Sequence, residues 1–160
     1  MKVIYGSIIA AALTGCASVQ IPDTLKPASN ESLALIVPAK GDQVYECRDG
    51  KWAFVAPDAR LFDREGKQIG KHYAGPHWEA ADGSKVIATV KSRADAPAAN
   101  AIPWLLLSAK SVGTEGAFSR VTSIQRVATT GGVGPTGACS QNGQQARVPY
   151  TADYYLYNAR

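Results

Sequence analysis

Two histidines and a glutamate near the middle of the chain are the residues whose types could perform chemistry. His72, His77 and Glu79 flank a Gly75-Pro76 pair. This pair predicts a turn, because proline fixes its own φ and biases the preceding residue away from helix. Zinc takes three or four nitrogen, sulfur or oxygen ligands, and the turn could bring the two imidazoles together. One interpretation is therefore a divalent metal site made by His72, His77 and Glu79, which would serve a metal-dependent enzyme or hydrolase.

The second interpretation is structural, because the spacing matches no established metal motif such as His-Glu-x-x-His on a helix. The histidines are then partly exposed residues at a hairpin tip, hydrogen-bonded or packed on Trp78. In this case Tyr73, His77 and Trp78 form a candidate ligand-binding surface. We favour this interpretation, which needs no cofactor and assigns no catalytic residue.

Other chemistries find little support in the sequence. Gly-x-Ser-x-Gly is missing, and sequence alone cannot set the separation of carboxyl pairs that glycoside hydrolysis requires. The glycine-rich stretch 131–137 lacks the Lys-Ser/Thr ending of a phosphate-binding loop. The formal net charge of +4 is scattered along the chain, which argues against a nucleic-acid partner.

The stretch from Gly66 to Val90 predicts the hairpin that would position the histidines. Residues 67–72 alternate with a period of two, as in a strand. Asp82-Gly83 is a strong hairpin signal, and the β-branched residues of 85–90 favour a returning strand. His77 and Glu79 should project to one face of this hairpin and Trp78 to the other.

Short strands separated by turn signals recur along the rest of the chain. We expect a strand at 33–37 ended by Pro38, a turn at 40–42, a strand at 43–48, an Asp49-Gly50 hairpin, and a strand at 51–55 ended by Pro57. Further strands are expected at 102–107, 118–127, 146–148 and 154–157. Tyr154 and Leu156 should share one face of the last strand and Tyr155 and Tyr157 the other, with core packing on at least one.

These elements predict an all-β fold, a single-domain antiparallel sandwich or barrel over residues 33–160. No stretch of this region shows a convincing helical period.

The first residues predict export and lipidation. Residues 1–15 have a short positive start and an apolar run too short to span a bilayer, as in a signal peptide. Leu13-Thr-Gly-Cys16 looks like a bacterial lipoprotein box, in which Cys16 is lipidated. Residues 16–32 would be the lipidated tether. In Gram-negative lipoproteins, an Asp directly after the lipidated cysteine usually marks retention in the inner membrane. No Asp follows Cys16, so this resemblance implies the outer membrane, with the domain facing the periplasm.

The two other cysteines, Cys47 and Cys139, favour a disulfide. Exported proteins mature in an oxidising compartment where leftover thiols tend to pair. The alternative is two free buried thiols.

Four motifs together resemble a bacterial and fungal family of secreted proteins known only as a domain of unknown function. They are GKHYAGPHWE (70–79), IPWLLL (102–107), VTSIQR (121–126) and VPYTADYY (148–155). The resemblance covers residues 33–157 and implies a shared fold and export, with no activity or cofactor attached. We therefore expect a lipid-anchored cell-envelope protein that acts as a binding module more than as an enzyme. Its expected partners are the membrane and an envelope glycan or protein.

Overall fold

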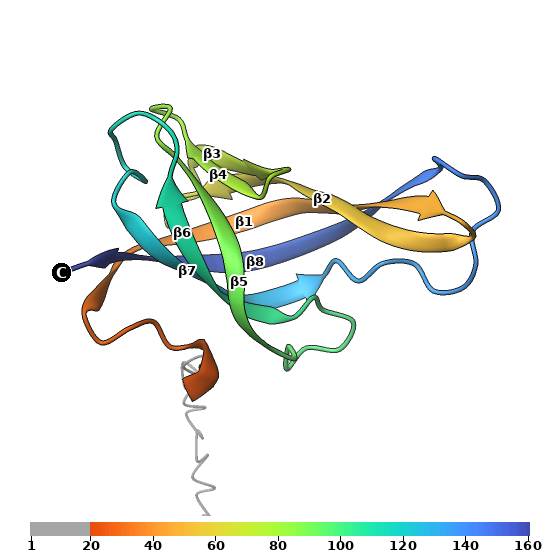
Figure 1. Cartoon of the computed structure of the whole chain (residues 1–160), viewed down its shortest axis with the longest axis horizontal. Coiled ribbons are helices and arrows are strands. Elements are labelled where there is room, and N and C mark those ends of the chain that lie inside the picture. The colour runs from red at the N-terminus through yellow and green to blue at the C-terminus, as the bar shows by residue number, and fades with distance from the viewer. Residues whose placement is uncertain (1–19) are drawn as a thin grey trace, which may run out of the picture.

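A computed structural model describes residues 20–160, which form eight strands after one turn of 3₁₀-helix (Figure 1). The elements in chain order are η1 (Asp23–Leu25), β1 (Glu31–Arg48), β2 (Lys51–Phe62), β3 (Gln68–Tyr73), β4 (His77–Ala80), β5 (Lys85–Ala94), β6 (Trp104–Ser111), β7 (Val121–Gly131) and β8 (Gln145–Ala159).

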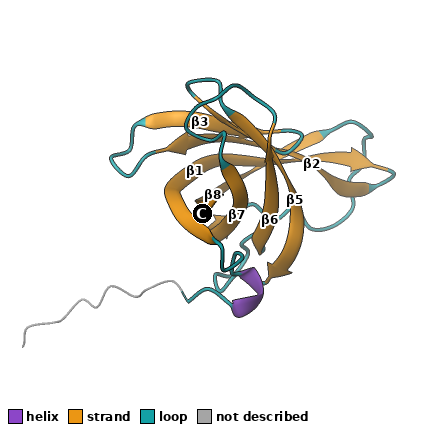
Figure 2. Cartoon of the chain, turned by 60° about the vertical axis from the view of Figure 1, so that its left-hand side comes forward, coloured by secondary structure: helices purple, strands orange, loops and turns teal. Residues whose placement is uncertain are grey.

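Each strand pairs antiparallel with its neighbour in sequence, and β8 returns to pair with β1, which closes the sheet into a barrel. Figure 2 shows the strands curling round a common interior. Pairing around the barrel is incomplete, because β3 pairs only with residues 59–62 of β2 and β4 only with residues 85–87 of β5. Residues 51–58 of β2 and 88–94 of β5 therefore pair on one side only. The predicted all-β antiparallel fold is confirmed, and of the two architectures expected the chain adopts the barrel.

The turns predicted from glycine pairs are confirmed. Asp49 and Gly50, with φ of 52° and 78°, link β1 to β2, and positive φ at both central residues is typical of a type I′ hairpin turn. Gly75-Pro76 lies between β3 and β4, and Asp82-Gly83 between β4 and β5.

The strand ends predicted at Pro38 and Pro57, and the turn predicted at 40–42, are wrong. β1 continues through Pro38 and Gly41, and β2 continues through Pro57. At Gly41 an added Cβ would lie 2.2 Å from the Asp58 carbonyl oxygen, so this glycine permits a close approach of two strands and makes no turn. The two strands predicted at 146–148 and 154–157 form the single strand β8.

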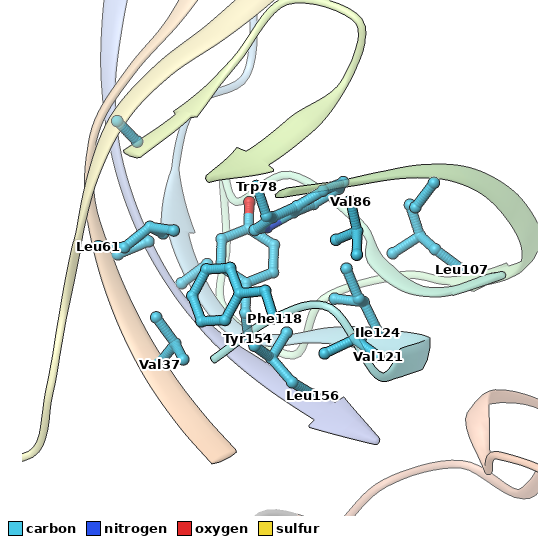
Figure 3. Packing of buried hydrophobic residues seen from close by; sticks show 14 of the residues in the cluster. Val37, Leu61, Trp78, Val86, Leu107, Phe118, Val121, Ile124, Tyr154 and Leu156 are labelled. Carbon is cyan, nitrogen blue, oxygen red and sulfur yellow. The ribbon is translucent and has the colours of Figure 1, made fainter. Parts of the chain in front are cut away.

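Inward-facing apolar side chains from all around the barrel form the main core (Figure 3). Its largest members include Leu61, Trp78, Ile124, Tyr154 and Leu156. Tyr154 and Leu156 therefore face the core as the alternation predicts, and Tyr155 and Tyr157 take the opposite face of β8. Phe118, which is 1% exposed, enters the core from the connection between β6 and β7.

A second, smaller core lies outside the barrel, under the N-terminal segment. Leu25 of η1 is fully buried against Trp104, Leu106 and Val127. Gln125 Nε2 donates a hydrogen bond of 2.6 Å to the Leu25 carbonyl oxygen. Part of the segment predicted as a tether thus packs on the barrel.

The predicted signal peptide and Cys16 lie outside the described residues. Within residues 20–160, no helix has the length and apolar character needed to cross a bilayer.

The predicted disulfide is confirmed. Cys47 at the end of β1 is bonded to Cys139 in the connection between β7 and β8, with 5.8 Å between the two Cα atoms. Cys139 N–H also donates to the Gly50 carbonyl oxygen at 3.0 Å. The bond fastens a glycine-rich loop to the β1–β2 hairpin.

Candidate functional site

The β3–β4 hairpin separates the predicted site residues between its two faces. In the antiparallel register His72 lies opposite Trp78 and Tyr73 opposite His77. Side chains alternate between the faces of a strand, so His72 and Trp78 enter the barrel, where both are buried. Tyr73, His77 and Glu79 stay on the outer face.

The outer face of the hairpin is a cluster of mutually satisfied polar groups. The Tyr73 hydroxyl donates to the Glu79 carboxylate, which also lies 3.3 Å from Lys71 Nζ and 3.6 Å from Lys85 Nζ. The Tyr73 hydrogen bond, followed by the two lysines, holds the pKa of Glu79 below its usual range. The His77 ring stacks on Tyr73 with 5.1 Å between ring centroids, and its Nδ1 donates to the Ala74 carbonyl oxygen at 2.6 Å.

The structure therefore does not bring together the three residues predicted to bind metal. His72 lies inside the barrel, and Glu79 outside it is held by Tyr73 and two lysines. Within residues 20–160, no group of three or more His, Cys, Asp and Glu side chains is placed to hold a metal ion. The contact surface predicted from Tyr73, His77 and Trp78 is also divided, because Trp78 faces the interior.

Inside the barrel, His72 is part of an aromatic cluster. Its ring stacks on Trp78 with 4.0 Å between centroids and meets the edge of Tyr154 at 5.2 Å. Its Nδ1 donates to the His77 carbonyl oxygen at 2.8 Å. Burial lowers the pKa of His72 to about 3, so the imidazole is neutral at physiological pH.

This aromatic cluster forms the floor of a pocket of about 140 Å³. The pocket extends from the surface residues Phe54 and Val90, which are 53% and 57% exposed, to the fully buried Tyr154. Leu105 and Leu107 line it as well, so most of its wall is apolar. A cavity of roughly this size admits a benzene-sized molecule.

Besides His72 and Tyr154, the polar side chains that line the same pocket are Gln43 of β1, Trp78 of β4 and Arg126 of β7. Gln43 and Trp78 are each 2% exposed, and within the described chain Gln43 Nε2 and Trp78 Nε1 have no hydrogen-bond partner. Buried polar atoms are nearly always satisfied in native proteins. A ligand or water that reaches these two donors would satisfy them.

Gln43 and Arg126 are not among the site residues predicted from the sequence. The signal for Arg126 was present in the predicted strand 118–127, because Arg126 follows two residues after the apolar Ile124, and alternation places the two on one face. For Gln43, the alternation of 43–48 predicts a face shared with Tyr45 and Cys47, but it does not predict which strand faces lie opposite.

Comparison with known proteins identifies the family of the chain. A family model described as "Protein of unknown function (DUF3455)" matches residues 27–158. The chain belongs to this family. No curated protein and no solved structure matches it significantly.

Proposed function

We propose that this DUF3455 protein is a lipid-anchored binding module of the cell envelope, which takes a small ligand into the apolar pocket of its barrel. The observation that carries the proposal is the apolar pocket between the surface residues Phe54 and Val90 and the buried Tyr154, with the orphaned donors of Gln43 and Trp78 on its wall. Apolar concave sites with a few convergent polar groups are typical of small-molecule sites.

The construction of the barrel supports a preformed site. Phe118 is buried in the core, and Ser84 Oγ accepts a hydrogen bond of 3.0 Å from its backbone N–H. The floor of the pocket is built from the stacked rings of His72 and Trp78 and from Tyr154, which meets both edge-on. Rings held by packing on strands lose little further freedom when a ligand binds, which favours affinity.

The lipid anchor in this proposal is Cys16, because Leu13-Thr-Gly-Cys16 has the form of a lipoprotein box. Acyl chains on Cys16 would bind the membrane, since each buried CH₂ contributes roughly 0.8 kcal/mol to membrane binding. In this proposal they hold the barrel at the periplasmic side of the outer membrane. A pocket held at a membrane surface is suited to ligands that are themselves partly apolar.

Calorimetric titration of the purified protein with octanol tests the binding function. We expect saturable binding by the wild type and at least a tenfold loss of affinity in Leu105→Trp, because the larger side chain fills the pocket. Val112→Trp is the matched control, since Val112 is 45% exposed and lies outside the pocket lining. Absence of octanol binding by the wild type, or equal binding by the Leu105→Trp variant, would contradict the proposal.

A further inference from the structure

The pocket presents hydrogen-bond donors and one positive charge. We propose, on the basis of the binding function above, that the ligand is an amphipathic carboxylate whose head is bound by Arg126 together with Gln43 and Trp78. Its apolar body would lie along Leu105 and Leu107 and extend past Phe54 and Val90.

Arg126 is a partly buried cation without a counter-charge. Its Nε and Nη2 donate to the Pro103 carbonyl oxygen at 3.0 and 2.8 Å, and this fixes the plane of the guanidinium. No ion pair found in residues 20–160 includes Arg126. Charges removed from water are normally paired, and guanidinium geometry matches a carboxylate with two parallel N–H···O bonds. An anionic ligand would supply the missing partner.

The two orphaned groups add donors to the same pocket. Trp78 Nε1–H can only donate, and it has no acceptor among the described residues. The Gln43 Nε2 amide likewise has no acceptor among the described residues. A carboxylate has two oxygens and accepts several hydrogen bonds, so one head group can satisfy donors on β1, β4 and β7 together.

The other titratable side chains of the pocket, His72 and Tyr154, supply no negative charge to pair with Arg126. Burial raises the pKa of Tyr154, so the Tyr154 hydroxyl keeps its proton and stays neutral. His72 is neutral because its imidazole is sealed in the core and its Nδ1–H is already donated to the His77 carbonyl oxygen. Arg126 is then the one ionised side chain among those that line the pocket.

The volume and wall of the pocket limit the ligand body. A space of about 140 Å³ holds the head group and a short apolar segment, and the rest of the ligand must leave through the mouth. The mouth residues Phe54 and Val90 are exposed apolar side chains, and their burial by a ligand would be favourable in free energy. These features favour a medium-chain carboxylate over a small polar acid.

Calorimetry with octanoate, octanol and octylammonium compares three heads on one chain. We expect wild-type protein at pH 7.5 to bind octanoate at least tenfold more tightly than octanol and to bind octylammonium most weakly. Arg126→Gln should weaken octanoate binding about tenfold and octanol binding much less, and an unchanged circular dichroism spectrum shows that the variant is folded. Arg126→Lys, which keeps the charge, should recover part of the loss. Arg120→Gln, an exposed arginine away from the pocket, is the matched control.

The outcomes separate the two proposals. Equal affinities for octanoate and octanol, or an Arg126→Gln variant that binds octanoate as well as the wild type, would overturn the carboxylate assignment and leave the binding function standing. Failure of all three compounds to bind would overturn both.

Discussion

At the scale of single residues, stacking on other aromatic rings takes the place of hydration for the His72 side chain inside the barrel. The His72 ring is buried against Trp78 and Tyr154 and donates a single hydrogen bond to the His77 carbonyl oxygen. Burial disfavours the imidazolium and lowers the pKa of His72 to about 3. The consequence is a stability that depends on pH.

The sign of this dependence follows from proton binding. In the unfolded chain His72 has an ordinary pKa near 6.5 and takes up a proton as the pH falls, whereas folded His72 does not until about pH 3. Stability is therefore full above the unfolded pKa and declines as the pH falls below it. Between pH 7.5 and 5.5 the contribution of His72 to the unfolding free energy should fall by about 1.4 kcal/mol.

Urea unfolding of the wild type and of His72→Phe at pH 7.5 and 5.5 measures this contribution. Phenylalanine keeps the stacked ring and removes the titrating group, so the variant should lose about 1.4 kcal/mol less than the wild type over this interval. Equal losses in the two proteins would show that His72 titrates normally when folded.

At the scale of elements, the Asp82-Gly83 turn is coupled to a distant connection. Asp82 accepts hydrogen bonds from Ser84 N–H at 2.9 Å and from Ala117 N–H at 2.8 Å. Ser84 Oγ, which also donates to Asp82, accepts from Phe118 N–H at 3.0 Å. The turn thus holds the β6–β7 connection in the position that inserts Phe118 into the core.

Replacing Asp82 by alanine should lower the urea midpoint of unfolding, because it leaves the buried Ser84 hydroxyl and the Ala117 N–H without their acceptor. Asp82→Asn, which keeps an acceptor oxygen, should lose less. Chemical denaturation of both variants at pH 7.5 measures the difference. A loss no larger for alanine than for asparagine would contradict the role given to the carboxylate acceptor.

The disulfide acts at the same scale. Cys47 and Cys139 are 92 residues apart, and closing a loop of this length stabilises by roughly 4 to 5 kcal/mol in the chain-entropy model, which gives an upper figure. The Cys47→Ser/Cys139→Ser double variant should therefore be less stable by about 2–5 kcal/mol in urea unfolding. A loss below about 1 kcal/mol would mean that the loop between β7 and β8 is held mainly by its other contacts.

The sequence predicted turns better than strand ends, and the physical reason is local. Asp49-Gly50 and Asp82-Gly83 require backbone conformations that few other residue pairs adopt, so these signals depend on nothing distant. Pro38, Gly41 and Pro57 are residue types that commonly end strands, but each lies within a long strand. Whether a proline or glycine ends a strand depends on the neighbouring strand. At Gly41, a side chain would clash with Asp58 and Ala59 across the sheet.

At the scale of the whole molecule, the pocket is a product of closure. Gln43, Trp78 and Arg126 come from β1, β4 and β7 and are separated by tens of residues. They share a pocket only because β8 pairs with β1 and turns the inner faces of these strands toward one interior. Sequence alternation could place each side chain on a face, but it could not give the strand order or decide that the sheet closes.

The proposed anchor also belongs to the whole molecule. Mass spectrometry of protein extracted from bacterial membranes should give a chain that begins at Cys16 and carries acyl chains, and Cys16→Ser should move the protein from the membrane fraction to the soluble fraction. An intact Met1, or a Cys16→Ser variant that stays in the membrane fraction, would contradict the anchor. Ligand binding by the barrel would be unaffected by that result.

The most direct test of the central claim uses the three tryptophan indoles as reporters. Trp78 lines the pocket, whereas Trp52 and Trp104 are not among its lining residues. In a ¹H–¹⁵N correlation spectrum titrated with octanoate, we predict a saturable shift of the Trp78 Nε1–H resonance as the N–H acquires an acceptor, with the Trp52 and Trp104 resonances nearly unmoved. A Trp78 resonance that stays in place while octanoate binds, or shifts of similar size at all three indoles, would contradict a binding site inside the barrel.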